Sequence, residues 1–337
     1  ARIKENQIDM LIVDEAHRIG KKSHNQYTKP SDRTDMPQVE QLIRCAKTSI
    51  FFIDDKQVIR FLEVGNTELI KNAAKKYGKM VQVGQWQRSQ PHFVDAINYL
   101  KTGKLGRIRT CKAWSYVDWK GPVPKVPDTP VPEGVDYDMW LGPAPVKPYN
   151  PHRVHETFRG YWDYDGGGLG DMGQHYLDPV QYLLGKDDTG PVSVEIDAPQ
   201  QHYDAVGSWR RITYTFADGC RIILDGENRE SDAAYIEGPK GKIYRGFRSD
   251  IKNLDKLISS LPDPQPQITT FTESVKTRKK FALNEENGHR SCSIVNLGII
   301  ALRLGRNLKY DPVKQRFVDD EAANRLIAQP MRGPWRI

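Results

Sequence analysis

An aspartate and a histidine one helical turn apart are the residues best suited to chemistry in this chain of 337 residues. Asp171 and His175 follow the glycine-rich run 166–170, and a helix predicted over residues 170–184 places both side chains on one face. A carboxylate beside an imidazole suits proton transfer to and from a hydroxyl group. The alternative is structural: an aspartate stabilised by the helix dipole, with a buried histidine one turn later.

The same glycine-rich run formally contains a dinucleotide-binding fingerprint. Gly168, Gly170 and Gly173 satisfy G-x-G-x-x-G. That fingerprint requires a buried strand before it and a parallel strand soon after it. The polar and aromatic residues 162–165 precede it instead, and no such strand follows before Pro191. We therefore predict that these glycines begin a helix and do not hold a pyrophosphate.

Two acidic residues close an apolar run near the start of the chain. Asp14 and Glu15 end the predicted strand 8–15, which is the Walker B arrangement, where the aspartate holds Mg²⁺ and the glutamate polarises the attacking water. Asp54 and Asp55 follow the next predicted strand, as in a helicase-like ATPase. The chain has no G-x-x-x-x-G-K-[ST], so the phosphate cradle is missing. The alternative is that these acids only begin solvated loops.

Hydrophobic periodicity predicts the elements that position these residues. Strands at 8–15, 49–55 and 80–84 alternate with helices at 37–47 and 66–77, which predicts a partial parallel β-α-β-α-β region. A different pattern follows, in which a Pro-rich loop and short alternating strands predict an open, mainly antiparallel sheet with helices on one face. Its predicted elements are a helix at 91–105, a strand at 107–119, a loop at 121–151 packed through Tyr137, Trp140 and Tyr149, strands at 192–196, 209–216, 219–225, 234–237 and 242–246, and helices at 272–281 and 287–304. The predicted fold class is thus α/β plus α+β.

Composition excludes some classes of protein and leaves others. No apolar run approaches the roughly 20 residues that span a bilayer, so no membrane protein is expected. The net charge of +7 is spread along the chain, so no nucleic-acid partner is expected. Four well-separated cysteines favour reduced thiols over disulfides or a metal site, and hence a cytoplasmic location. The chain opens without Met, which suggests a missing start and leaves room for an exported precursor.

From residue 72 to 337 the chain resembles the glucose-fructose oxidoreductase, inositol dehydrogenase and MocA (Gfo/Idh/MocA) family. The matching stretches are 73–84, 139–145, the block ending at Asp171 and His175, 301–312 and 321–335. The resemblance implies NAD or NADP as cofactor, hydride transfer at a sugar or cyclitol hydroxyl, and a homo-oligomer formed through the open sheet. It makes Asp171 and His175 the catalytic pair, with His175 taking the hydroxyl proton.

The resemblance also suggests residues that contact the ligands. Substrate contacts are expected from Arg153, His155, Arg159 and Trp162, and contacts to nicotinamide or substrate from Gln85, Gln87 and Arg88. The alternative for the first four is loop packing. The family's own G-x-G-x-x-G and Glu-Lys-Pro are missing, and Lys56 lies near the position of the family's lysine without the neighbouring Glu and Pro.

Residues 1–71 resemble part of an ATPase domain related to Schlafen-type and superfamily-one helicases. We therefore predict a chimera joined near residues 72–79, with a partial, Rossmann-like parallel α/β domain at 1–88 and a substrate and oligomerisation domain at 89–337. A natural fusion or a divergent N-terminal domain is the alternative. The predicted function is that of an NAD(P)-dependent sugar oxidoreductase lineage, inactive as this chain because the dinucleotide motif is missing. Two other functions stay open: an ATPase-associated module built on Asp14 and Glu15, and a non-catalytic oligomerising domain.

Overall fold

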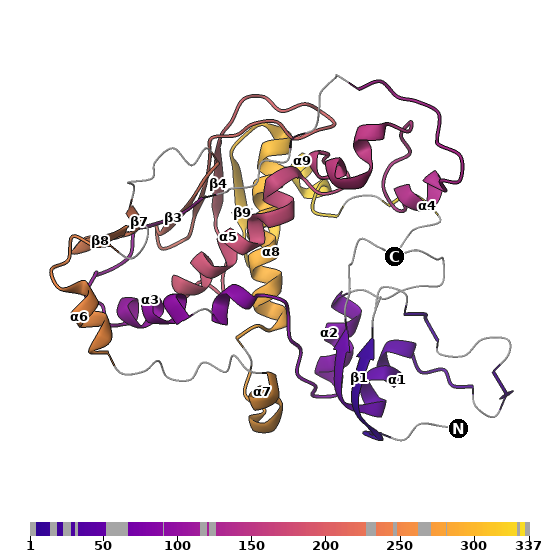
Figure 1. The fold of residues 1–337 in the computed structure, drawn as a ribbon, viewed down its shortest axis with the longest axis horizontal. Coiled ribbons are helices and arrows are strands. Elements are labelled where there is room, and N and C mark those ends of the chain that lie inside the picture. Colours follow the sequence, from indigo (N-terminus) through magenta and orange to yellow (C-terminus); the bar gives the residue numbers. More distant parts are fainter. Residues whose placement is uncertain are drawn as a thin grey trace.

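The computed structural model places an N-terminal parallel α/β unit beside a larger domain built on an eight-stranded sheet (Figure 1). The structure describes residues 5–13, 19–22, 28–30, 33–51, 67–89, 91–114, 120, 126–226, 234–244, 248–261, 271–280, 282–328 and 331–333. Asp14, Glu15, Asp54, Asp55 and Lys56 lie outside these residues.

The N-terminal unit contains β1 (Ile8–Val13), α1 (Gln38–Cys45), β2 (Ala46–Phe51) and α2 (Thr67–Lys76). β1 and β2 pair in parallel, as predicted. Val39 and Ile43 of α1 join Ile70 and Ala73 of α2 in a small core, because their spacing puts them on one face of each helix. Gly78 follows α2 with a φ of +60°, a conformation that glycine adopts at helix ends with the least strain.

The third strand predicted at residues 80–84 is not part of this sheet, which has two strands within the described residues. The N–H of Val83 donates instead to the carbonyl of Leu283, at 2.7 Å, just before the long helix of the larger domain. The segment's extended backbone is thus used to join the two parts of the molecule. It continues into the 3₁₀ helix η3 (Trp86–Ser89).

The larger domain is a mixed sheet with strand order β10-β9-β4-β5-β6-β3-β7-β8. Its strands are β3 (Thr110–Trp114), β4 (Ser193–Asp197), β5 (Arg211–Thr215), β6 (Arg221–Asp225), β7 (Ala234–Gly238), β8 (Gly241–Tyr244), β9 (Leu308–Asp311) and β10 (Arg316–Phe317). All neighbouring pairs are antiparallel except β3 and β6, which are parallel. The predicted open, mainly antiparallel sheet is therefore confirmed.

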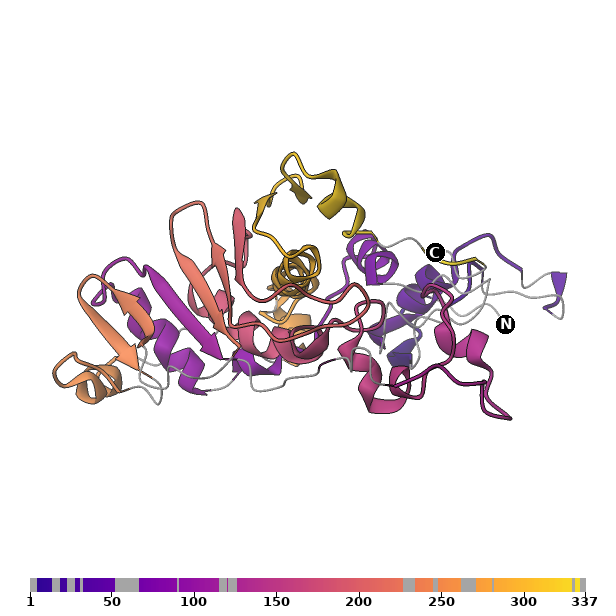
Figure 2. The same ribbon diagram turned by 90° about the horizontal axis from the view of Figure 1, so that it is seen from above.

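Helices α3 (Pro91–Lys101), α5 (Gly167–Leu183) and α8 (Glu285–Leu304) lie along one face of this sheet (Figure 2). Strands β5 and β6 alternate accordingly, with Ile212, Tyr214, Ile222 and Leu224 wholly buried against the helices. The remaining helical elements are α4 (Tyr137–Leu141), η4 (Pro151–Arg153), η5 (His155–Gly160), α6 (Leu254–Ser259), α7 (Phe271–Thr277) and α9 (Glu321–Arg325).

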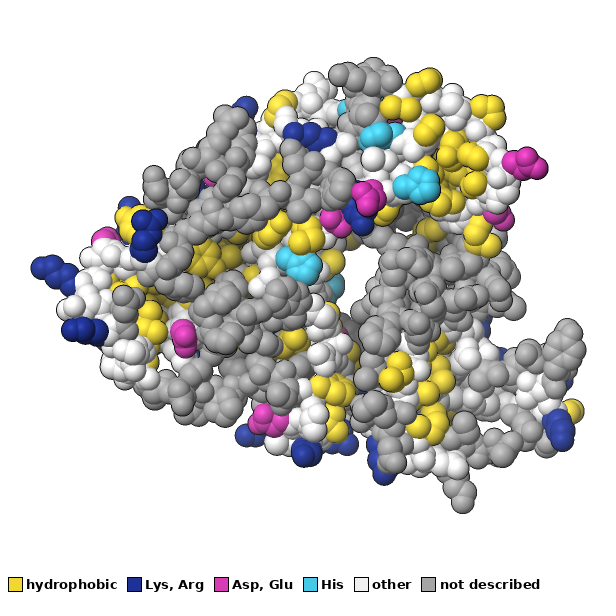
Figure 3. Space-filling view, in the orientation of Figure 1, with side chains coloured by type: hydrophobic (Ala, Val, Ile, Leu, Met, Phe, Trp, Pro, Cys, Tyr) yellow, Lys and Arg dark blue, Asp and Glu magenta, His cyan; other side chains and the backbone are white. Residues whose placement is uncertain are grey.

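The described part of the Pro-rich loop, residues 126–151, is packed through its aromatic side chains, as predicted. Tyr137 meets Tyr149 edge to face at 5.2 Å between ring centroids, and Trp140 meets Tyr164 at 5.0 Å. Asp136 caps α4 by accepting from the N–H of Met139. Figure 3 shows hydrophobic side chains gathered on the surface around α4, where Val135 and Met139 are exposed.

Candidate functional site

Helix α5 carries the predicted catalytic residues, and its glycines let it begin where it does. The helix starts at Gly167, three residues earlier than predicted, because Gly166 turns the chain with a φ of +91°. A Cβ on Gly170 would lie 1.8 Å from the carbonyl oxygen of Asp165. Gly168, Gly170 and Gly173 therefore all lie within the helix, which agrees with the prediction that they are not a dinucleotide turn.

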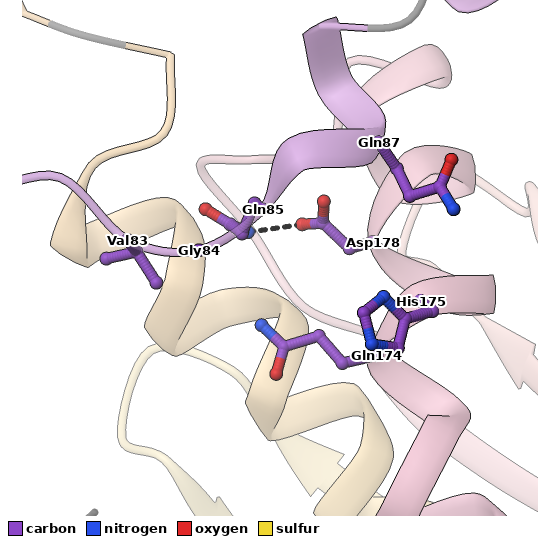
Figure 4. Close-up of a pocket in the computed structure, with 7 residues that line it drawn as sticks. All are labelled: Val83, Gly84, Gln85, Gln87, Gln174, His175 and Asp178. Carbon is purple, nitrogen blue, oxygen red and sulfur yellow. Dashed lines mark hydrogen bonds between the residues drawn. The ribbon is translucent and has the colours of Figure 1, made fainter. Parts of the chain in front are cut away.

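A pocket of about 250 Å³ lies where the segment before η3 meets α5 (Figure 4). Its lining consists of three glutamines, one histidine, one aspartate and two small or apolar residues: Val83, Gly84, Gln85, Gln87, Gln174, His175 and Asp178. His175 thus reaches the pocket, together with two of the predicted contacts, Gln85 and Gln87. The lining offers hydrogen-bond donors and acceptors close to an imidazole, which suits a hydroxylated ligand.

Behind the pocket lies a buried ionic cluster of Arg88, Asp178 and Asp187. The Arg88 side chain is 0% exposed, and its Nη2 donates to Asp178 at 2.6 Å while its Nη1 donates to Asp187 at 2.5 Å. The guanidinium also lies over the ring of Tyr182, 4.6 Å from its centroid. The predicted ligand contact Arg88 is therefore placed behind Asp178 and is not one of the residues that line the pocket.

Burial raises the pKa of Asp178, and the hydrogen bonds from Arg88 act in the opposite direction. For Arg88, burial alone would lower the pKa, but the bonds to Asp178 and Asp187 outweigh it and raise the pKa, so the side chain stays charged. The cluster continues into the pocket wall, because the Nε2 of Gln85 donates to Asp178 and, at 3.0 Å, to the Oγ of Ser291. These contacts hold the segment before η3 against both α5 and α8.

Asp171 lies one turn before His175 on α5 and is paired with Arg159. The Nε of Arg159 donates to the Asp171 carboxylate at 3.1 Å, with both side chains partly exposed. Asp171 is not among the seven residues that line the pocket. The structure thus brings His175 to the pocket and places Asp171 beside it on the same helix.

The other predicted substrate contacts lie in the segment that precedes α5, which includes η4 and η5. Arg153 pairs with Asp204 at 2.9 Å, and the buried Trp162 donates from its indole to the carbonyl of His202. His155 is exposed, with a φ of +55° that is unusual for a residue with a side chain. None of Arg153, His155, Arg159 and Trp162 lines the pocket.

Sequence reasoning did not single out Asp178, Gln174 or Ser291. Asp178 could have been found, because it follows His175 by three positions and shares its helix face. Ser291 could not, because it lies 206 positions after Gln85 in the sequence. Only the packing of α5 against α8 brings the two residues together.

A dinucleotide cofactor would need a cradle for its pyrophosphate. A cradle for a pyrophosphate needs glycines at the turn after the first parallel strand, but β1 ends at Val13 and the sequence continues Asp-Glu-Ala-His-Arg. The three glycines that match the fingerprint are packed inside α5. The residues present therefore do not fit the pyrophosphate of such a cofactor.

Neither a metal-ligand cluster nor a membrane-spanning helix is found among the described residues. They contain no group of three or more His, Cys, Asp or Glu side chains that could hold a metal ion. None of their helices combines the length and apolar character needed to cross a membrane.

Comparison with known families divides the chain in two. A model of the oxidoreductase family (Gfo/Idh/MocA) C-terminal alpha/beta domain matches residues 104–337. A model of the Schlafen group 3 DNA/RNA helicase domain matches residues 1–103. No curated protein matches the chain.

Several solved structures resemble the fold at low identity. Aldose-aldose oxidoreductase from Caulobacter crescentus is 17% identical, with 89% of this chain and 79% of that chain covered and a TM-score of 0.46. An NAD-binding protein from Listeria innocua is 14% identical, with 89% and 78% covered and a TM-score of 0.49. The WlbA dehydrogenase from Bordetella pertussis, solved with NADH and UDP-GlcNAcA, is 12% identical, with 81% and 75% covered and a TM-score of 0.47. All three TM-scores are below 0.5, so the match of residues 104–337 is the stronger finding.

Proposed function

Because the chain belongs to the Gfo/Idh/MocA oxidoreductase family, whose C-terminal domain model matches residues 104–337, we propose that it carries the substrate half of an NAD(P)-dependent sugar or cyclitol oxidoreductase. The observation that supports this most is the position of His175 in a pocket lined by glutamine amides. In this proposal residues 1–88 form one domain and residues 89–337 form the substrate domain.

Each residue of the site has a distinct part in the proposal. His175 takes the proton of the reacting hydroxyl, since a neutral imidazole is a good general base near neutral pH. Asp171, held by Arg159, stabilises the imidazolium that results. Gln87 and Gln174 orient neighbouring hydroxyls through their amides, which can both donate and accept.

Oxidation of the hydroxyl also requires a hydride acceptor, and in this family that is a nicotinamide cofactor. The described residues do not fit its pyrophosphate, so we propose that this chain binds its substrate without turning it over.

Binding measurements test this proposal. We expect glucose or myo-inositol to bind the full chain and to shift the NMR resonances of His175, because the hydroxyl contacts the imidazole. His175→Ala should weaken binding by about tenfold, whereas His289→Ala, at an exposed position on α8, should leave it unchanged. If His175→Ala bound the sugar as tightly as the native chain does, the proposed site would be contradicted.

A fluorescence titration tests whether the chain binds a nicotinamide cofactor. We expect no saturable binding of NADH or NADPH up to millimolar concentrations, because no glycine-rich turn follows β1. Saturation at micromolar concentrations would show that the N-terminal unit provides a cofactor site by other means.

A second candidate function is that of an ATPase-associated module. It is favoured by the match of residues 1–103 to a helicase domain, and it depends on Asp14 and Glu15. ATP hydrolysis that is lost in Glu15→Gln would support it. The two matches also support our proposal that the chain joins two lineages. They meet between residues 103 and 104, whereas the proposed join lies near residues 72–79. Sequencing the locus on single molecules across codons 60–85 would test whether that join is native.

We also propose a homo-oligomer formed through the outer face of the sheet, opposite the three helices (Figure 2). The outward side chains on β5 include Arg211 and Thr213, which are exposed or half-buried. A molar mass by light scattering that matched one chain would contradict this.

A further inference from the structure

The charges of the residues that line the pocket indicate whether its ligand is charged or neutral. Among the described residues that line it, none is Lys or Arg. The polar lining consists of the amides of Gln85, Gln87 and Gln174, the imidazole of His175 and the carboxylate of Asp178. Its described lining therefore offers uncharged donors and acceptors together with one negative charge, that of Asp178.

Arg88, the cation behind Asp178, does not reverse this negative charge. Arg88 is wholly buried behind Asp178, and its nitrogens bond both to Asp178 and to Asp187. With both carboxylates ionised, the three groups carry a net charge of −1. On the other side of His175, the Arg159 guanidinium is paired with Asp171.

An anionic group and a hydroxyl group would meet this pocket differently. A carboxylate or phosphate that entered it would lose hydration and find no cation among the described residues that line the pocket, with the Asp178 carboxylate facing it. A hydroxyl group can donate to an amide oxygen and accept from an amide N–H, so hydroxyls would be matched by the amides of Gln87 and Gln174. The Nε2 of Gln85 already donates to Asp178 and Ser291.

We propose that the pocket selects uncharged polyols and discriminates against sugars that carry a carboxylate or a phosphate. The inference rests on the proposed function, and it narrows the substrate to neutral sugars and cyclitols. It follows from residues of this chain: the glutamines at 85, 87 and 174, and the carboxylates that share Arg88.

The test compares matched pairs of ligands by calorimetry on the full chain at pH 8. Glucose and glucuronate differ only in one CH₂OH that becomes a carboxylate, and myo-inositol and its monophosphate form a second pair. We expect the neutral member to bind at least about tenfold more tightly in both pairs. Equal affinity, or tighter binding of the anion, would overturn the inference.

A substitution at the pocket checks that charge is the cause. Gln87→Lys adds a cation to the lining and should reduce the preference for glucose over glucuronate, whereas Gln200→Lys, at an exposed position outside the lining, should not. A preference that stays the same in Gln87→Lys would overturn the electrostatic explanation. If no sugar of either kind binds or shifts His175, the proposed function itself fails; if sugars bind with the opposite preference, only this inference fails.

Discussion

Arg88 is a fully buried cation, and its charge is compensated by two carboxylates, Asp178 and Asp187, about 90 and 100 positions later in the sequence. Removing one partner of a buried ion pair costs far more than the pair contributes, because the remaining charges lose their compensation. We expect Arg88→Met to lower the free energy of unfolding by about 3–5 kcal/mol, measured by urea denaturation. Arg316→Met, which removes an arginine from an exposed pair with Glu321, should cost less than about 1 kcal/mol. Similar losses in both variants would contradict the role given to burial.

Asp204 gives the protein a dependence on pH. Burial alone would raise the pKa of Asp204, but hydrogen bonds from Lys147 and Arg153 lower it below its ordinary value. A carboxylate with a lowered native pKa adds stability above its unfolded pKa of about 4, and this stability is lost as the pH falls through the native value. We expect Asp204→Asn to be about 2 kcal/mol less stable than the native chain at pH 7 and to approach it in stability below pH of about 4.

Unfolding curves between pH 3 and pH 8 would show this convergence. Asp188→Asn, at an exposed position, is the matched control and should parallel the native chain throughout. A constant difference between Asp204→Asn and the native chain would mean that the carboxylate's charge is not the cause.

Helix α5 depends at its start on a position without a side chain. A Cβ on Gly170 would lie 1.8 Å from the carbonyl oxygen of Asp165, a backbone atom that cannot move alone. We expect Gly170→Ala to destabilise the protein by more than about 3 kcal/mol in urea denaturation. Gly333→Ala, where nothing lies within 4 Å of the added carbon, should have little effect. A tolerated Gly170→Ala would show that the helix can begin later, as the sequence predicts.

The elements that the sequence predicts well are those with a clear period. Helices α1 and α8, and strands β5 and β6, were predicted within a few residues, because apolar side chains recur every three to four positions in the helices and every second position in the strands. The prediction of a strand at 80–84 was wrong, because apolar residues indicate burial without showing which neighbour will accept the hydrogen bonds of their backbone. The N–H of Val83 donates to the carbonyl of Leu283, 200 positions later in the sequence, and no local pattern predicts this contact.

The candidate site divides in the same way. His175 and Asp178 come from a single helical turn and are accessible to sequence reasoning. Arg88, Asp187 and Ser291 meet only through tertiary packing, so the burial of Arg88 was not predictable from local spacing.

At the scale of the whole molecule, the N-terminal unit has its own core and is joined to the larger domain through residues 77–85. Figure 1 shows it to one side of the eight-stranded sheet. We expect a chain shortened to residues 82–337 to keep the pocket and to bind glucose within about twofold of the full chain, because the residues that line the pocket begin at Val83. Calorimetric unfolding should show the loss of one transition and an unchanged second one. Failure of the shortened chain to fold would mean that the two units form one cooperative structure.

The position of β3 in the sheet has a consequence for how the protein is made. β3 lies between β6 and β7, and its ladder with β6 pairs Thr110 with Arg221, 111 residues later. At a synthesis rate of about 5–20 residues per second, the ribosome takes roughly 5–20 s to produce that partner. For this time the N–H and C=O groups of β3 have no native strand beside them. The nascent chain is therefore exposed to mispairing after β3 has left the ribosome, and a chaperone that binds extended segments would protect it during this interval.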